Sequence, residues 1–261
     1  MTDRSMQGAR PLTASAFRPL HLADHPDALG AVGLPVADHL LRRGLLQDAQ
    51  RLSLRPGDPT ARLEDIRQDL FQQRWIEPPR DEQMPVTIGP KGAELARLDR
   101  SALRILGFWA QKVHINGLVT DVTGKPQVWV SRRSRQALSN PGRWDTLIAG
   151  GRAAGQSLAQ TAQKEGWEEA GITSAEMKQL QPIGEMAVQY VSDRGFHQEL
   201  LVIYDLFLPA SFSAICHDGE IEESRLLPFD TLVARLGDPQ GFKFSSYLVL
   251  TDLVTRLQGG G

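Results

Sequence analysis

The sequence contains a single cysteine, Cys216, which excludes an intrachain disulfide and the paired-cysteine motifs of metal or redox sites. His217 and Asp218 follow it, but a lone cysteine is more often structural than nucleophilic. No stretch approaches the roughly 18 apolar residues of a membrane helix. Residues 1–15 also lack the apolar core of a secretory signal. We therefore expect a cytoplasmic protein with no membrane partner.

The sequence also has no large excess of positive or negative charge. The chain has 29 basic and 31 acidic residues, for a net charge of -2. Such a balance gives no overall field that would attract nucleic acid, so no nucleic-acid partner is expected. The 261 residues, 41% hydrophobic and 23% charged, are ordinary for a soluble protein and suit one large domain or two small ones.

The pattern of the chain changes near residues 78–92, where prolines, glycines and charges predict a loop or a short strand between loops. Before this stretch, residues 36–75 are predicted to be largely helical, and another helix is predicted over about 92–106. After it, alternating and continuous apolar runs predict strands, with a final helix over about 244–257. The predicted strands cover 113–119, 127–130, 147–149, 187–191 and 199–208.

One segment carries most of the chemical information, a double glycine followed by a helix with several glutamates. Ser157 and Gln160 have the spacing of a capping box, and Gly171 suits the left-handed residue that closes a helix. These signals predict a helix over about 158–170. Glu165, Glu168 and Glu169 then fall on one side of it. A separate face is made of small residues that can approach a sheet closely: Ala159, Ala162, Gly166 and Ala170.

Three glutamates on one helix face repel each other, and a divalent cation relieves this repulsion. Hard oxygen ligands favour Mg²⁺, with Mn²⁺ as an alternative, and Mg²⁺ commonly uses substrate phosphates as further ligands. The simpler interpretation is a solvated acidic face. The combination of a glycine loop, a cap, a small-residue face and three registered carboxylates favours the metal site.

The segment resembles the Nudix box, G-x5-E-x7-R-E-U-x-E-E-x-G-U, where U is a bulky aliphatic residue. Three positions depart from the pattern: Gln156 replaces a glutamate, Lys164 an arginine and Gly166 an aliphatic residue. The resemblance implies that Gln156 and Lys164 brace the loop and helix differently, while the metal-binding glutamates are intact. The matching positions are Gly150, Glu165, Glu168, Glu169, Gly171 and Ile172.

A closer resemblance extends over about residues 105–255, to the Nudix subgroup related to the N-terminal half of fungal thiamine pyrophosphokinase fusions. It is carried by segments 113–117, 129–134, 141–145, 149–151, 202–206 and 218–223. It implies an α/β fold, the Nudix α/β/α sandwich with a mixed sheet, over residues 106–261. A small α+β domain over residues 1–105 would precede it. It also implies a thiamine-type substrate, such as a damaged thiamine diphosphate that is converted to the monophosphate. An ADP-ribose or nucleoside-diphosphate pyrophosphatase, and a non-catalytic ligand-sensing domain, are the alternatives.

The expected activity is that of a pyrophosphohydrolase acting on a small-molecule diphosphate. By resemblance, the metal ligands are Glu165, Glu168, Glu169 and the Gly150 carbonyl. Glu165 would act through that metal, and Glu169 or Glu220 is the candidate general base, with a polar loop as the alternative role for Glu220. Four further residues are candidates for substrate binding, although a surface role for the arginines and a core role for the aromatic residue are alternatives: Arg132, Arg133, Gln189 and Tyr190.

Overall fold

The computed structural model describes residues 16–23, 25–48, 50–177 and 180–259, so the secretory-signal prediction for residues 1–15 lies outside the described residues. The described chain forms two compact units. The first contains the described parts of Met1–Gln111, Arg152–Gln156 and Ala187–Leu200. The second contains Lys112–Gly151, the described parts of Ser157–Met186, and those of Leu201–Gly261.

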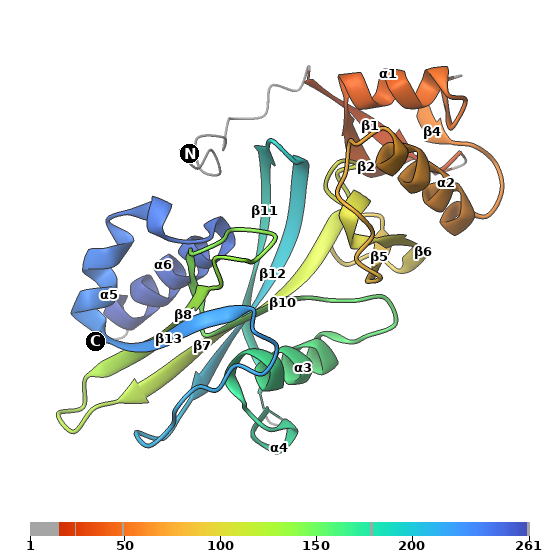
Figure 1. Ribbon diagram of the computed structural model, residues 1–261. Helices are drawn as coiled ribbons and strands as arrows, with labels where there is room; N and C mark the ends of the chain where they lie inside the picture. The colour runs from red at the N-terminus through yellow and green to blue at the C-terminus, as the bar shows by residue number, and fades with distance from the viewer. Residues whose placement is uncertain (1–15, 24, 49, 178–179, 260–261) are drawn as a thin grey trace. The chain divides into compact units, whose positions relative to one another are not determined.

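The first unit is built on a four-stranded sheet with the order β2-β1-β4-β3, accompanied by two helices (Figure 1). A two-stranded antiparallel sheet, β5-β6, belongs to the same unit. The elements are β1 Phe17–His21, β2 Ala28–Gly33, α1 Leu34–Arg42, β3 Leu46–Asp48, β4 Leu52–Leu54, α2 Pro59–Gln72, β5 Gln83–Thr87 and β6 Glu94–Asp99.

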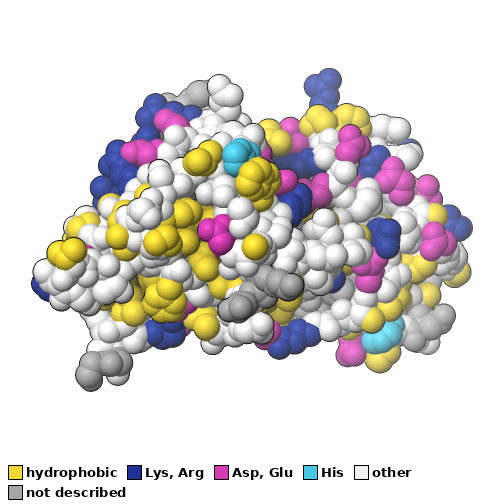
Figure 2. Space-filling view, turned by 90° about the horizontal axis from the view of Figure 1, so that it is seen from below, with side chains coloured by type: hydrophobic (Ala, Val, Ile, Leu, Met, Phe, Trp, Pro, Cys, Tyr) yellow, Lys and Arg dark blue, Asp and Glu magenta, His cyan; other side chains and the backbone are white. Residues whose placement is uncertain are grey.

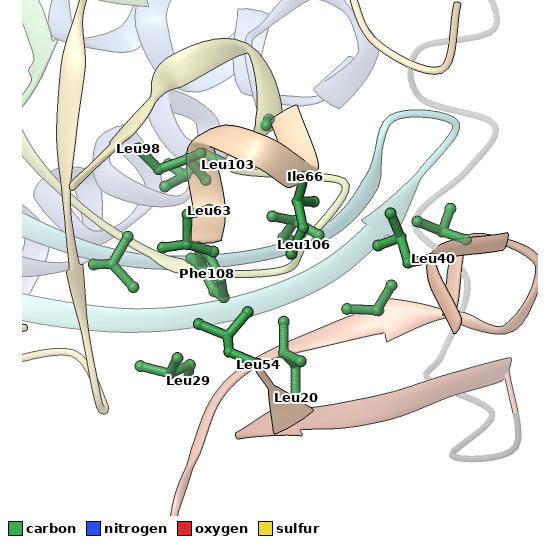
Figure 3. Close-up of a cluster of buried hydrophobic side chains, with 14 of the residues drawn as sticks. Leu20, Leu29, Leu40, Leu54, Leu63, Ile66, Leu98, Leu103, Leu106 and Phe108 are labelled. Atoms are coloured by element: carbon green, nitrogen blue, oxygen red, sulfur yellow. The ribbon is translucent and has the colours of Figure 1, made fainter. Parts of the chain in front are cut away.

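The core of this unit is a cluster of leucines and other apolar side chains, shown in Figure 3. The side chains of Leu63 and Ile66 on α2 are fully buried in it, as their helical spacing predicts. Phe108, which precedes β7, packs in the same cluster. Burial of this apolar surface is what stabilises a unit of such short strands.

Two of the helix predictions for this unit are wrong. Residues 94–99 form a strand, and only Arg100–Ala102 continue as a short 3-10 helix, η2. Leu98 and Ala96 are buried while Leu95 is exposed, so the true period is two, and the leucine spacing fitted a helix by coincidence. Residues 36–75 are also not largely helical, because β3 and β4 separate α1 from α2.

A seven-stranded sheet has the order β11-β12-β7-β8-β13, with β10 paired to β7 and β9 paired to β8. Each predicted strand falls largely within one of its members. Its strands β7, β11 and β12 contribute residues to both units. The bounds are β7 Trp109–Thr120, β8 Pro126–Arg133, β9 Trp144–Thr146, β10 Ile148–Gly151, β11 Pro182–Ser192, β12 Gly195–Phe207 and β13 Ile221–Pro228.

Helices complete the sandwich in the second unit. Helix α3, Leu158–Ala170, packs against β10, while α5, Phe229–Leu236, packs against β8 and β13. Helix α6, Phe244–Gly259, contacts β9 and confirms the predicted final helix. Figure 1 shows α3 on one side of these strands and α5 and α6 on the other. The expected α/β/α arrangement is therefore confirmed. The remaining short helices are α4, Ser174–Met177, and η3, Pro239–Gly241.

Candidate active site

Helix α3 begins and ends where its sequence signals predict. The Ser157 hydroxyl accepts a hydrogen bond from the Gln160 amide at 3.1 Å, and the Gln160 side chain accepts one from the Ser157 amide at 2.8 Å. Gly171 closes the helix with a φ of 68°, a left-handed conformation that favours glycine. These contacts satisfy backbone groups at both helix ends and set the position of the three glutamates.

The small-residue face of α3 is only partly as predicted. Ala162, Gly166 and Ala170 are buried, but Ala159 is exposed. A Cβ on Gly166 would lie 3.0 Å from the Met177 side chain of α4, so this glycine makes room for α4 rather than for the sheet. The small face therefore holds α3 between its neighbours on more than one side.

The structure brings Gly150 and two of the glutamates together at the junction of β10 and α3. A Cβ on Gly150 would lie 2.1 Å from the Glu165 carboxyl carbon, so this side chain rests directly on the glycine. Glu169 is 2% exposed, and its carboxylate accepts a hydrogen bond from the Ala149 amide at 2.7 Å. Glu168 is more open, with 31% of its side chain exposed.

The substitution Gly150→Ala tests whether activity requires the Glu165 carboxylate to lie against residue 150. The added methyl group would push the flexible end of Glu165 aside without displacing backbone. We expect kcat/KM for diphosphate hydrolysis to fall about 100-fold, because a displacement of about 1 Å can cost that much, while the melting temperature changes little. Gly184→Ala on β11 is the matched control, since nothing lies within 4 Å of its Cβ position. Full activity in Gly150→Ala would contradict the placement.

Glu169 has an unusual electrostatic environment. Burial raises the pKa of its carboxyl well above the ordinary value, and the negative charges of Glu165 and Asp145 raise it further. The Ala149 hydrogen bond and the positive charge of Lys243 only partly oppose this. The ionised form of Glu169 is therefore disfavoured at this position, a condition that a bound cation would relieve.

Lys164 supplies a positive charge at this place. Its ammonium lies 3.3 Å from a Glu165 carboxylate oxygen and 2.5 Å from one of Glu168. Where the general pattern has an arginine that braces the loop, this lysine binds two of the expected metal ligands. Its single positive charge offsets one of the two negative charges of this carboxylate pair, whereas a divalent ion would offset both.

The donors present fit a hard divalent cation. Mg²⁺ and Mn²⁺ prefer oxygen ligands. Such oxygens come from the neighbouring carboxylates of Glu165 and Glu168 and from the backbone of Gly150, which the Glu165 side chain contacts. Among the described residues, no three His, Cys, Asp or Glu side chains are already arranged around one metal position. For a cation to bind, the Lys164 ammonium would have to leave the Glu165 and Glu168 carboxylates, and the cation would take its place.

The two candidate arginines on β8 have different surroundings. Arg133 is 7% exposed and its guanidinium lies 3.2 Å from Glu220 and 3.8 Å from Asp145. Arg132 is more accessible, with 28% of its side chain exposed, and lies 5.7 Å from the centre of the Trp144 ring. Arg132 and Arg133 point to opposite faces of the sheet because successive side chains alternate along a strand.

Glu220 lies in the loop before β13, where its side chain is 58% exposed and pairs with Arg133. The same loop is tied to the box helix, because the His217 amide donates to the Glu168 carbonyl at 2.7 Å. The His217 ring also stacks on Trp167 of α3, with a centroid separation of 4.3 Å. Cys216 is half-buried, and burial raises the pKa of its thiol, in keeping with a structural role.

Gln189 and Tyr190 belong to the first compact unit, whereas the three glutamates of α3 belong to the second. Gln189 donates to the Gln198 side chain at 2.8 Å. Tyr190 stacks on His197, at a centroid distance of 4.2 Å, and its hydroxyl donates to Glu199 at 3.3 Å. Their candidate role in substrate binding stays a prediction.

Sequence comparison identifies the family of this chain. Residues 110–248, more than half of its length, match the NUDIX domain family model. The chain belongs to the Nudix family.

Similar Nudix proteins occur in plants. The chain is 30% identical over 202 residues to "Nudix hydrolase 20, chloroplastic" of Arabidopsis thaliana, covering 77% of this chain and 54% of that protein. It is also 30% identical over 177 residues to "Nudix hydrolase 24, chloroplastic" of the same organism, covering 68% of this chain and 48% of that protein. The chain thus spans about half the length of the curated relatives it matches.

A solved structure supports the fold. The crystal structure of DR0079 from Deinococcus radiodurans matches with a TM-score of 0.51 at 18% identity, covering 67% of this chain and 98% of that one. At this level of identity the likeness concerns the Nudix fold alone.

Sequence reasoning did not predict the surroundings of Asp145 and Lys164. Asp145 is 1% exposed and forms hydrogen bonds with Lys243 at 2.8 Å and with Ser246. The signal was a charged residue beside the otherwise apolar 147–149 strand. The position of Lys164 on the metal-site carboxylates could not be read from its spacing alone, since an i, i+4 pair on a helix surface is also a common solvated contact.

Proposed function

We propose that this Nudix domain is a pyrophosphohydrolase that cleaves a diphosphate linkage in a small molecule with Mg²⁺ or Mn²⁺. The observation that carries the proposal is the contact of the Glu165 side chain with Gly150, the first residue of the box. Glu168 and the buried Glu169 lie on the same helix. The relatives named above are hydrolases, which supports the same activity.

A bound cation would supply charge neutralisation on the phosphoryl oxygens and would lower the pKa of water. Glu165, Glu168, Glu169 and the Gly150 carbonyl would hold it, and Lys164 would move from the carboxylates toward solvent. Glu169 is positioned by the Ala149 amide, which fixes one of its carboxylate oxygens. Burial and the charges of Glu165 and Asp145 raise the pKa of Glu169, which makes its carboxylate a stronger proton acceptor, so it is the preferred general base. Glu220 is the second candidate, through movement of its loop.

Arg132 is the preferred phosphate-binding arginine. It is the more accessible of the two on β8, and a guanidinium can bind a phosphate through two parallel hydrogen bonds. Both arginines are engaged by carboxylates. Arg132 pairs with Glu223 at 3.0 Å and Glu222 at 3.4 Å. The more buried Arg133 pairs with Glu220 and donates to the Ser139 carbonyl at 3.1 Å. We assign Arg133 the role of holding the loops at this end of β8.

For the substrate, we propose a thiamine-type diphosphate that is converted to a monophosphate. The support is the resemblance of segments 113–117, 129–134 and 141–145 to the subgroup related to thiamine pyrophosphokinase fusions. ADP-ribose or a nucleoside diphosphate is the alternative substrate, and ligand sensing without catalysis is the alternative function.

A substrate panel tests these assignments. We expect phosphate-bond cleavage only with Mg²⁺ or Mn²⁺, and kcat/KM at least tenfold higher for thiamine diphosphate or its oxidised analogues than for ADP-ribose and NADH. Equal values across the panel would overturn the thiamine assignment and leave diphosphate hydrolysis standing. Absence of product from every compound, with metal binding intact, would favour a sensing domain.

The remaining proposals concern context. No helix among the described residues is long and apolar enough to cross a membrane. A cytoplasmic location stays our prediction, while the names of the two plant relatives place those proteins in the chloroplast. We keep the domain boundary between residues 105 and 106 as a proposal. Basic and acidic side chains both occur on the face shown in Figure 2, which supports a small-molecule rather than a nucleic-acid partner.

A further inference from the structure

The loop between β10 and α3 belongs to the first compact unit, although the two elements that it joins belong to the second. It covers Arg152–Gln156. We call it the box loop, because it connects Gly150 to the helix that carries the three glutamates. Residues of the first unit can thus act on the Nudix box through the main chain.

The β5–β6 hairpin accepts two hydrogen bonds from the box loop. The Ala154 amide donates to the carbonyl of Gln83, the first residue of β5, at 2.8 Å. The Gly155 amide donates to the carboxylate of Glu94, the first residue of β6, at 3.4 Å. Two consecutive amides of the loop are therefore held by one hairpin.

Gln111 on β7 connects the same hairpin to the start of the box loop. Its carbonyl accepts a hydrogen bond from the Arg152 amide at 2.9 Å. Its side chain donates to the carbonyl of Pro90, in the turn between β5 and β6, at 2.7 Å. Within the loop, the Arg152 guanidinium donates to the Gln156 carbonyl at 3.0 Å. The box loop is thus held from its first residue to its last.

Glu94 is the residue of the hairpin whose side chain makes the contact. Its carboxylate is 26% exposed, and the oxygen that does not bind Gly155 accepts a hydrogen bond from the Arg97 guanidinium at 2.7 Å. The Arg97 hydrogen bond lowers the pKa of Glu94, burial opposes this, and the Gly155 amide and the charge of Arg152 lower it further. Glu94 is therefore ionised at neutral pH, and a charged acceptor binds an amide more strongly than a neutral one.

We propose that the β5–β6 hairpin braces the box loop and that Glu94 is a positioning residue for the Nudix site, an inference that rests on the proposed hydrolase function. The resemblance to the Nudix box implied that Gln156 and Lys164 brace this region in a different way from the general pattern. Lys164 contacts the carboxylates of Glu165 and Glu168. The hairpin of the first unit supplies the constraint on the loop.

Holding the box loop restricts both of its ends. Gly150 lies two residues before the loop, and α3 begins two residues after it. A loop that moves freely would let Gly150 and the glutamates of α3 shift relative to each other, and small displacements of catalytic groups are costly. Glu94 therefore acts on the reaction through the metal ligands.

Hydrogen exchange followed by mass spectrometry tests the brace without any measurement of activity. In Glu94→Ala the amides of the box loop should exchange about tenfold faster than in the wild type, because the variant loses a hydrogen bond to a charged acceptor. Glu94→Gln keeps an acceptor oxygen at this position and should restore most of the protection. Arg97→Ala is the matched control, since it removes the ion pair of Glu94 and leaves the Gly155 contact in place.

The same variants are then compared in diphosphate hydrolysis at saturating Mg²⁺. In Glu94→Ala we expect kcat to fall about tenfold and KM to change by less than about twofold, because a positioning residue shifts the metal ligands and removes no substrate contact. Glu94→Gln should recover most of kcat, and Arg97→Ala should match the wild type.

The inference is overturned if the box loop of Glu94→Ala exchanges like that of the wild type, or if the wild type is active and Glu94→Ala has the same kcat. It is equally overturned if Glu94→Gln is as defective as Glu94→Ala, or if Arg97→Ala has an effect as large, since the ion pair would then be responsible. A wild type that cleaves no diphosphate refutes the proposed function instead, and the exchange result alone then decides whether the hairpin braces the loop.

Discussion

Replacing Glu168 with glutamine is expected to remove most of the Mg²⁺-dependent hydrolysis while leaving the fold intact. Glu168 is the most accessible of the three glutamates, and its carboxylate contacts Lys164 rather than the core. Loss of one anionic ligand removes several kcal/mol of the charge stabilisation that a metal gives to phosphoryl transfer. We therefore expect kcat to fall roughly 100-fold to 1,000-fold at saturating Mg²⁺.

Replacing Glu168 tests the loss of a metal ligand without disturbing buried contacts. Glu169 is buried against the Ala149 amide and Glu165 rests on Gly150, so replacing either also disturbs local contacts. Glu77→Gln, at an exposed position in the first unit, is the control for loss of one carboxylate. A second readout is Mn²⁺ binding by electron paramagnetic resonance, which should weaken in Glu168→Gln and stay unchanged in Glu77→Gln. Wild-type kcat in Glu168→Gln would exclude it as a ligand.

Local signals in the sequence were enough to predict helix α3 to the residue. The capping box, the glycine at the C-terminal end and the three glutamates act within one short segment, so no long-range contact was needed to place them. Five strands of the large sheet, β7, β8, β10, β11 and β12, were also predicted, and the continuous apolar run of β12 is typical of a buried central strand. The strands β9 and β13 were not predicted.

The failures arise where tertiary contacts decide. In β6, leucines three residues apart fit a helix, but pairing with β5 imposes a period of two and exposes Leu95. The spacing of Lys164 permits contact with Glu168 but does not say that the ammonium also reaches Glu165. Likewise, the partners of Asp145 lie about a hundred positions away, Lys243 directly before α6 and Ser246 on it, so no local pattern reveals them.

Asp145→Asn is expected to cause the largest loss of stability. The carboxylate is 1% exposed, and it accepts hydrogen bonds from Lys243, Ser246 and the Thr146 amide. Lys243 is itself largely buried, and the substitution removes the carboxylate that pairs with its ammonium at 2.8 Å. Removing one member of a buried ion pair costs about 3–5 kcal/mol. At about 2–4 °C per kcal/mol for a protein of this size, the melting temperature should fall by roughly 10 °C.

The pH dependence gives this prediction a second readout. Burial alone would raise the pKa of Asp145, but Lys243, His114 and Arg133 outweigh it and hold the pKa well below its usual range. A carboxyl with a lowered folded-state pKa stabilises the protein above its unfolded-state pKa of about 4, and that contribution is lost as the pH falls below this value. Between pH 7 and pH 3 the melting temperature of the wild type should therefore fall more steeply than that of Asp145→Asn. Asp230→Asn on α5, an exposed carboxyl, should follow the wild-type curve, and parallel curves for the wild type and Asp145→Asn would contradict the role of the buried pair.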